Sequence, residues 1–156
     1  MDIRDVIVRE ACLDDLQDLL RFEQELIQAE RPFDPTIRPS PLLYYDLEKL
    51  IQDEDVGVYV AEYKGKLISS GYGMAREARH YLDHEKYAYL GFMYTDPDYR
   101  GKGVNQKVLS VLKQWAKKQG LSEMRLTVYD ENIAAIKAYE RAGFQKHIIE
   151  MRLREK

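Results

Sequence analysis

The chain has 156 residues, a length that suits one folded unit with one core, and its formal net charge of −3 gives no case for nucleic-acid binding. It has no long apolar segment and begins with charged residues, so we expect neither a membrane span nor a signal peptide and predict a cytoplasmic protein. Cys12 is the only cysteine, which excludes an intrachain disulfide, and three scattered histidines give no metal-binding pattern.

Charge is divided unevenly along the chain. Residues 1–60 hold 6 basic and 15 acidic side chains, a balance of −9, whereas residues 61–156 hold 18 and 12, a balance of +6. Two explanations stay open. The acidic part attracts a cationic partner, or its acids merely coat a helix.

The first third of the chain is predicted to form one strand and two helices. Residues 6–10 are β-prone, and residues 16–30 repeat apolar side chains at helical spacing after two aspartates that can cap a helix. Three prolines within residues 31–39 exclude a continuing helix. Ser40–Pro41 has the form of an N-cap followed by a proline at the first helical position, which predicts a short helix from there to Ile51.

Three consecutive strands are predicted next. Residues 56–63 and 66–75 are separated only by Lys64–Gly65, a spacing that suits a tight hairpin turn. Residues 87–95 carry no charge and are rich in aromatic and β-prone side chains, which indicates a buried central strand. The polar stretch 77–86 is expected to form an exposed connection that extends both neighbouring strands.

A glycine-containing loop joins this central strand to an amphipathic run that begins at Val104. Gly101 and Gly103 remove side chains where a ligand must approach the backbone, and the first amides of the following helix have no intrahelical acceptor. These amides, the helix dipole and the side chains of Arg100 and Lys102 favour a phosphate or pyrophosphate group. The loop lacks both a Walker motif and the GxGxxG dinucleotide fingerprint. An ordinary tight strand-to-helix turn is the alternative.

The C-terminal part completes a mixed fold. After a helix closed by Gly120, residues 124–129 alternate as a strand, residues 132–142 form a helix and residues 144–153 supply a last strand. We therefore predict one domain over residues 1–156 of the α/β class, α+β in type. Its mixed, mainly antiparallel sheet would have about six to seven strands, flanked by about four helices.

The loop also resembles a family motif. Arg100-x-x-Gly103-x-Asn105 is similar to the Arg/Gln-x-x-Gly-x-Gly/Ala motif of the GNAT superfamily of acetyl-CoA-dependent N-acetyltransferases. Asn105 departs from that motif, because the family has Gly or Ala there. The resemblance covers the chain from Val56 onward, and the first third only by the order of its elements.

A second motif, from Asn132 to Phe144, resembles the C-terminal segment of the same family. The resemblance implies transfer of an acetyl group from acetyl-CoA, without a metal, to a primary amine by direct attack in a ternary complex. Tyr139 then matches the tyrosine that protonates the departing CoA thiolate, with simple packing between helix and sheet as the alternative. The implied cofactor contacts are Met93, Tyr94, Thr95, Arg100, Gly101, Lys102, Gly103, Val104, Asn105, Gln106, Asn132 and Tyr139.

The sequence assigns no general base. Many family members carry a glutamate two residues before the position of Met93, but here that position is Gly91 and the central strand lacks carboxylates. Tyr89 and Tyr94, acting through water, stay open, as does a neutral amine taken from solution. The polar connection offers five further candidates: Glu77, His80, Asp83, His84 and Glu85.

The acceptor is also undefined: a small-molecule amine, a polyamine and a protein amine fit equally well. Twelve tyrosines either line an acceptor site that holds an ammonium group or pack against the sheet. Gly91 and Asn105 keep a non-catalytic acyl-CoA-binding sensor or regulatory module open as the alternative function, and a generic phosphate-binding domain is the third. We expect no nucleic-acid or membrane partner, and a homodimer is compatible with the resemblance.

Overall fold

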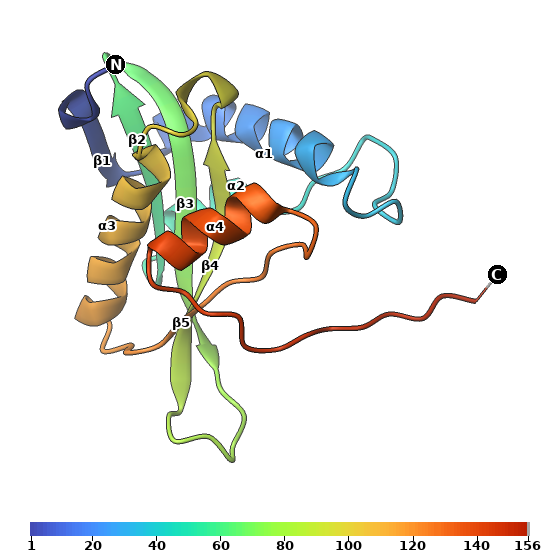
Figure 1. Cartoon of the computed structure of the whole chain (residues 1–156). Helices are drawn as coiled ribbons and strands as arrows, with labels where there is room; N and C mark the ends of the chain where they lie inside the picture. Colours follow the sequence, from blue (N-terminus) through green and yellow to red (C-terminus); the bar gives the residue numbers. More distant parts are fainter. Residues whose placement is uncertain (156) are drawn as a thin grey trace.

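The computed structural model describes residues 1–155 and has a mixed α+β fold, as predicted (Figure 1). Its elements in chain order are β1 (Val6–Glu10), α1 (Leu16–Glu30), α2 (Leu47–Gln52), β2 (Val56–Tyr63), β3 (Lys66–Glu77), β4 (Lys86–Thr95), α3 (Val104–Lys118), β5 (Met124–Arg125) and α4 (Ile133–Arg141). None of the helices in the described part of the chain is both long and apolar enough to cross a membrane.

The sheet follows the chain order β1-β2-β3-β4-β5. Its strands are antiparallel to their neighbours except β5, which runs parallel to β4. The hairpin between β2 and β3 forms as predicted, because Lys64 and Gly65 both adopt positive φ angles, 48° and 79°, that suit a two-residue turn. The predicted class is confirmed, although the sheet has five strands where six to seven were expected.

Helices cover both faces of the sheet (Figure 1). Leu19 and Phe22 of α1 pack with buried residues of β2, β3 and β4 on one face. On the other face, Val108 and Leu112 of α3 pack with buried residues of β3 and β4. The Trp115 ring of α3 lies directly on the sheet, and a Cβ atom on Gly73 would come within 2.6 Å of it. The core therefore has two layers, with β4 buried between them.

The helix predicted to open at Ser40–Pro41 starts six residues later, and this prediction was wrong. α2 begins at Leu47, where the Asp46 carboxylate caps it by accepting the Lys49 amide at 3.2 Å. The buried Glu23 carboxylate of α1 accepts the two preceding amides, those of Tyr44 and Tyr45, at 2.9 and 2.8 Å. These long-range hydrogen bonds hold the segment before α2 outside a helix.

The C-terminal strand predictions also need correction. The strand expected over residues 124–129 pairs at only two positions, and the segment 144–153 forms no strand at all. That segment instead leaves the body of the molecule as an extended trace (Figure 1). A sequence with alternating apolar and polar residues forms a strand only where it can pair with the edge of a sheet. Among residues 1–155, no sheet edge pairs with this segment.

Candidate active site

The loop between β4 and α3 is a tight turn, and the helix that follows it has no capping side chain at its amino terminus. The Asp96 carboxylate accepts the Asp98 amide at 3.0 Å, which turns the chain immediately after β4. Gly101 and Gly103 have φ angles of 73° and 89°, in the left-handed region that favours glycine. Gly103 is the N-cap residue of α3 and has no side chain with which to cap it. The amides of the first turn are therefore open to an anionic ligand.

Three cationic side chains lie in or near this loop: two could bind a ligand, and the third holds the fold together. Arg100 Nε donates to the Thr95 carbonyl oxygen at 2.9 Å, and Lys102 Nζ donates to the Asp98 carbonyl oxygen at 3.1 Å. Both side chains are exposed, so their charge is available to a ligand. Lys107 donates to two backbone carbonyl oxygens near the start of the chain, at 2.8 and 2.7 Å, and so ties α3 to β1.

β4 is irregular immediately before the loop. Between the pairs that Gly91 and Tyr94 make with β3, two residues of β4 face one residue of β3, which is a β-bulge. Phe92 in this bulge has a φ of 54°. Two fully buried serines of β3 hold the bulge: Ser70 Oγ donates to the Phe92 carbonyl at 2.9 Å, and Ser69 Oγ donates to the Tyr94 carbonyl at 2.6 Å.

The other side of β4 is open beyond its first residues. β5 pairs with β4 only at Ala88 and Tyr89, so the stretch 93–95 has no strand partner on that side among the described residues. Met93 packs on the α3 side of the sheet, whereas the Tyr94 ring packs on Phe22 of α1 at a centroid distance of 4.7 Å. The backbone that was predicted to bind the pantetheine arm therefore lies at an unpaired strand edge that leads to the loop.

α4 is attached to the same region. Gln106 in the first turn of α3 donates to the Ala138 carbonyl oxygen at 2.9 Å, which places the adjacent Tyr139 near the start of α3. Burial raises the pKa of Tyr139 to about 12, with smaller contributions from Glu30 and Tyr89, so its phenol is protonated at neutral pH. Asn132 caps α4 by accepting the Ala135 amide at 3.3 Å, as the plain N-cap interpretation expected, and its contact with a cofactor stays a prediction.

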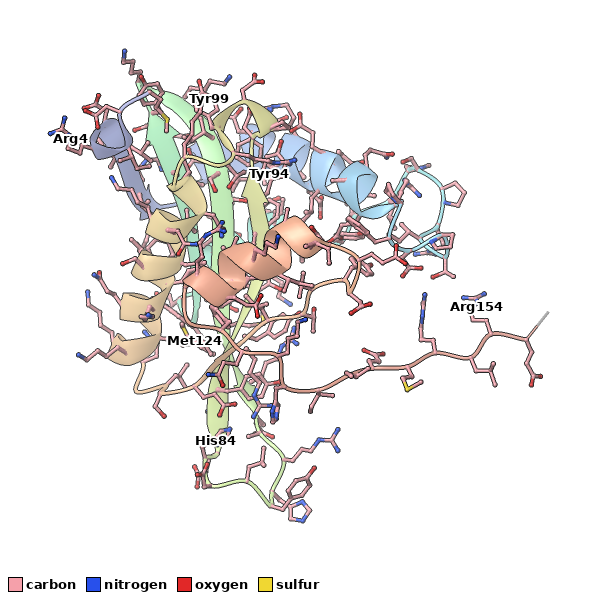
Figure 2. All side chains as sticks on the ribbon, viewed as in Figure 1. Arg4, His84, Tyr94, Tyr99, Met124 and Arg154 are labelled. Carbon is pink, nitrogen blue, oxygen red and sulfur yellow. The ribbon has the colours of Figure 1, made fainter. Side chains whose placement is uncertain are left out.

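Five of the candidate bases lie at the wrong end of the sheet. His84 is at one end of β4 and Tyr94 towards the other, which leads into the loop (Figure 2). The ten residues of β4 span roughly 30 Å. His84 instead bonds to Asp83 at 2.8 Å and to Arg125 at 2.9 Å, within a polar cluster at the tip of the β3–β4 hairpin. The polar connection from Glu77 to Glu85 thus supplies no side chain to the open edge of β4.

Position 91, where the family resemblance leads one to expect a glutamate, is sterically closed here. A Cβ atom on Gly91 would lie 2.4 Å from the Tyr72 ring and hydroxyl, so the Tyr72 side chain occupies the space of a residue-91 side chain. Tyr72 is 4 % exposed and packs edge-on against Tyr45. The buried Tyr72 side chain, packed against Tyr45, therefore lies where a carboxylate side chain on β4 would need space.

A carboxylate does approach from α1, and the sequence interpretation had treated it only as the end of a helix. Glu30 is the last residue of α1, and its carboxylate contributes to the raised pKa of the Tyr44 hydroxyl, after the larger effect of burial. Burial raises the pKa of Glu30, and Glu30 in turn contributes to the raised pKa of Tyr139. Tyr129 stacks on Phe33 at a centroid distance of 5.9 Å. Its pKa is raised by burial and, to a smaller extent, by Glu30. No local sequence signal joins these residues, because they come from four separate segments.

This combination of sheet, loop and helix belongs to a known family. Residues 20–144 match the acetyltransferase (GNAT) family, and the chain is therefore a member of it. The resemblance stated from the loop and from the segment before Phe144 is confirmed.

Individual relatives agree with this assignment. The chain is 29% identical over 154 residues to the uncharacterized N-acetyltransferase MJ1207 of Methanocaldococcus jannaschii, a match that covers 92% of this chain and 62% of the relative. The chain thus spans less than two thirds of that relative's length. Two solved structures are similar in fold. A variant of the BH1408 protein from Bacillus halodurans has a TM-score of 0.84 at 20% identity, covering 96% and 99% of the two chains. The aminoglycoside N-acetyltransferase AAC(6')-Iy in complex with CoA has a TM-score of 0.72 at 16% identity, with the same coverage.

Proposed function

We propose that this protein is an enzyme that transfers an acetyl group from acetyl-CoA to a primary amine. The observation that carries the proposal is the open edge of β4 at residues 93–95, which leads into the uncapped amino terminus of α3. Together they offer a strand edge without a strand partner and, at its end, free helix amides that can bind an anion. Family membership and the CoA-bound neighbour support acetyl-CoA as the ligand of this site.

In the proposed complex, the pyrophosphate of acetyl-CoA lies on the loop. The amides of residues 101–106 and the side chains of Arg100 and Lys102 bind its phosphate oxygens. The pantetheine arm follows the edge of β4 and pairs with the backbone of residues 93–95. Asn105 is half-buried in the first turn of α3 and can serve through its amide N–H, so its departure from the family motif leaves this contact possible.

The chemistry follows from the position of Tyr139. The amine nitrogen attacks the thioester carbonyl carbon, the carbon–sulfur bond breaks, and the electron pair leaves on the CoA sulfur. Tyr139 donates its phenolic proton to that sulfur. Because a phenol of pKa about 12 is a weaker acid than a thiol of pKa ~8.5, proton transfer from Tyr139 to the thiolate is unfavourable by itself. The attacking nitrogen releases a proton after it forms the new bond, and this proton returns to the Tyr139 oxygen through water.

The acceptor side favours a cationic amine. The Glu30 carboxylate contributes to the raised pKa values of Tyr44, Tyr129 and Tyr139, and together these groups could hold an ammonium group by charge and by its approach to aromatic faces. A carboxylate with a raised pKa can also accept a proton from that ammonium. We therefore propose that Glu30 replaces the glutamate that is missing from β4.

The test is turnover with a panel of amines that includes polyamines, aminoglycosides and lysine-containing peptides. Free CoA thiol is measured, and because Cys12 is an exposed thiol, the Cys12→Ser variant gives the background-free signal. The proposal expects turnover with cationic primary amines and none with their N-acetylated forms. Firm acetyl-CoA binding without turnover on any amine would contradict it.

That second outcome would favour a non-catalytic acyl-CoA-binding module. The observation behind this alternative is the Tyr72 ring, which closes the usual position of the base.

A further inference from the structure

Two neighbouring residues of β3, Ser69 and Ser70, place hydroxyl groups in the buried interior of the sheet. Both side chains are fully buried, within the stretch 67–73 where every residue is buried. A buried hydroxyl costs free energy unless it is hydrogen-bonded. Here each one donates to a backbone carbonyl oxygen of β4: Ser69 Oγ to that of Tyr94 at 2.6 Å, and Ser70 Oγ to that of Phe92 at 2.9 Å. The two serines therefore act on the backbone of the neighbouring strand.

The β-bulge of β4 explains why its backbone needs this support. In a regular pair of strands, the ladder of backbone hydrogen bonds fixes each peptide plane, but a bulge interrupts the ladder. Phe92 has a φ of 54° here, which is a strained conformation for a bulky residue. The next residue of β3, Gly71, also fits the bulge: a Cβ atom on it would lie 2.7 Å from Met93 Sδ, so the Met93 side chain uses that space. Residues 69–71 of β3 thus match the shape of the bulge.

Each serine determines the direction of one amide of β4. A peptide unit is planar, and in the trans form its carbonyl and its N–H point in opposite directions. Both units concerned are trans. Because the Phe92 carbonyl points to Ser70 on β3, the Met93 N–H points away from β3, towards the edge that has no strand partner among the described residues. The Thr95 N–H has the same direction, because Ser69 holds the carbonyl that precedes it.

We infer that Ser70 is a positioning residue of acetyl transfer: its hydroxyl holds the Met93 amide in place to donate to the thioester carbonyl oxygen of acetyl-CoA. This inference rests on the proposed function. When the amine nitrogen bonds to the carbonyl carbon, an electron pair moves to the carbonyl oxygen, and it returns as the carbon–sulfur bond breaks. An N–H that is already fixed stabilises this developing negative charge, because it needs no reorientation.

Ser69 has a parallel role at the other end of the same stretch. The pantetheine arm starts at the loop, so it meets the Thr95 amide first and brings its thioester end to Met93. Ser69, which holds the Thr95 amide, therefore serves binding of the arm, whereas Ser70 serves the reacting carbonyl. The two adjacent hydroxyls should differ in their effects on binding and on turnover.

Kinetics and stability separate positioning from a merely structural role. Ser70→Ala should lower kcat for the best amine about 20-fold, less than the ~100-fold lost with a whole oxyanion donor, and leave the acetyl-CoA Kd within about 3-fold. Ser69→Ala should leave kcat within about 3-fold and raise that Kd about 5-fold. Both variants lose one buried hydrogen bond, so denaturant unfolding should show similar losses of stability. An equal loss of kcat in the two variants would overturn the inference. If either alanine variant fails to fold, the cysteine variants at the same positions, which keep a weaker donor, should show the same differences at smaller factors.

Infrared spectroscopy of bound acetyl-CoA, labelled with ¹³C at the thioester carbonyl, tests the contact itself and needs no amine. A hydrogen bond polarises the carbonyl and lowers its stretching frequency. Ser70→Ala should therefore raise that frequency relative to the wild type, while Ser69→Ala, the matched deletion of an equally buried hydroxyl, should keep the wild-type frequency. Equal frequencies in all three proteins, or the same shift in both variants, would overturn the inference and leave the proposed function standing. A wild type that binds no acetyl-CoA would overturn both.

Discussion

The proposed cofactor side of this molecule consists mainly of backbone groups, whereas the proposed acceptor side consists of side chains. The proposed cofactor side consists of residues 93–106 and would bind mainly through backbone amides, left-handed glycines and an unpaired strand edge. The proposed acceptor side consists of the side chains of Glu30, Tyr44 and Tyr129, which come from α1 and two irregular segments. Backbone recognition can persist while side chains change, so one fold can keep its cofactor and vary its acceptor.

The largest expected effect lies where the two sides meet, at Tyr139. Tyr139→Phe removes only the hydroxyl and should lower kcat by about 100-fold, the lower range for a lost proton donor, with the acetyl-CoA Kd unchanged. Steady-state kinetics and calorimetry measure the two quantities. Tyr81→Phe, at the exposed tip of the β3–β4 hairpin, is the matched hydroxyl deletion and should change neither. Unaltered turnover in the Tyr139 variant would remove this residue from the mechanism.

A change in the loop should affect the cofactor side alone. Gly103→Val places a branched side chain at a φ of 89° and crowds the pyrophosphate position, so the acetyl-CoA Kd should rise about 30-fold. Gly65→Val introduces the same kind of backbone strain at a φ of 79° in the β2–β3 turn, with no atom within 4 Å of its Cβ position. If both variants bind acetyl-CoA equally well, the phosphate site is misplaced.

A change at Glu30 should affect the acceptor side alone. Glu30→Gln removes the charge that attracts and deprotonates the amine, so kcat/KM for the best amine should fall about 20-fold while the acetyl-CoA Kd stays constant. Asp18→Asn removes an exposed carboxylate from the same helix and serves as the control. An equal loss in both variants would mean that only the net charge of the helix matters.

The smallest effect is on stability and should leave both sites intact. Arg9 bonds to the nearly buried Asp15 at 2.8 and 2.9 Å and lowers the pKa of that carboxyl. A carboxyl with a lowered folded-state pKa adds stability above its unfolded pKa of ~3.9, and this contribution is lost as the pH falls through the folded value. Asp15→Asn should therefore reduce the free energy of unfolding by about 1.5 kcal/mol at pH 7.

Denaturant unfolding of the Asp15 variant at pH 7 and pH 3 checks the sign. The difference from the wild type should shrink below pH ~4. Asp14→Asn, at the exposed neighbouring position, should have little effect at either pH. A difference that grows on acidification would contradict the ion-pair account.

Local patterns were sufficient to predict the elements that position the cofactor side. The run 87–95 is apolar because β4 is covered on both faces, and the glycine pair before Val104 marks a turn that other residues enter only with strain. The hairpin at Lys64–Gly65 and the helix after Asn132 follow from equally local turn and cap chemistry.

Contacts between distant segments decided the rest. The start of α2 depends on Glu23, which accepts two amides about twenty residues further along the chain. The role of Gly91 depends on the Tyr72 ring from the neighbouring strand. Glu30 has no neighbour in sequence that marks it as part of a site. The last predicted strand does not form because no strand edge among residues 1–155 pairs with it.

The central claim is that the open edge of β4 and the start of α3 form an acetyl-CoA site, and calorimetric titration of the purified protein tests it most directly. Acetyl-CoA should bind with a Kd in the micromolar range, CoA should bind comparably, and ATP should give no heat above dilution. Equal binding of ATP and acetyl-CoA would indicate a generic phosphate site, and the absence of acetyl-CoA binding would contradict the account.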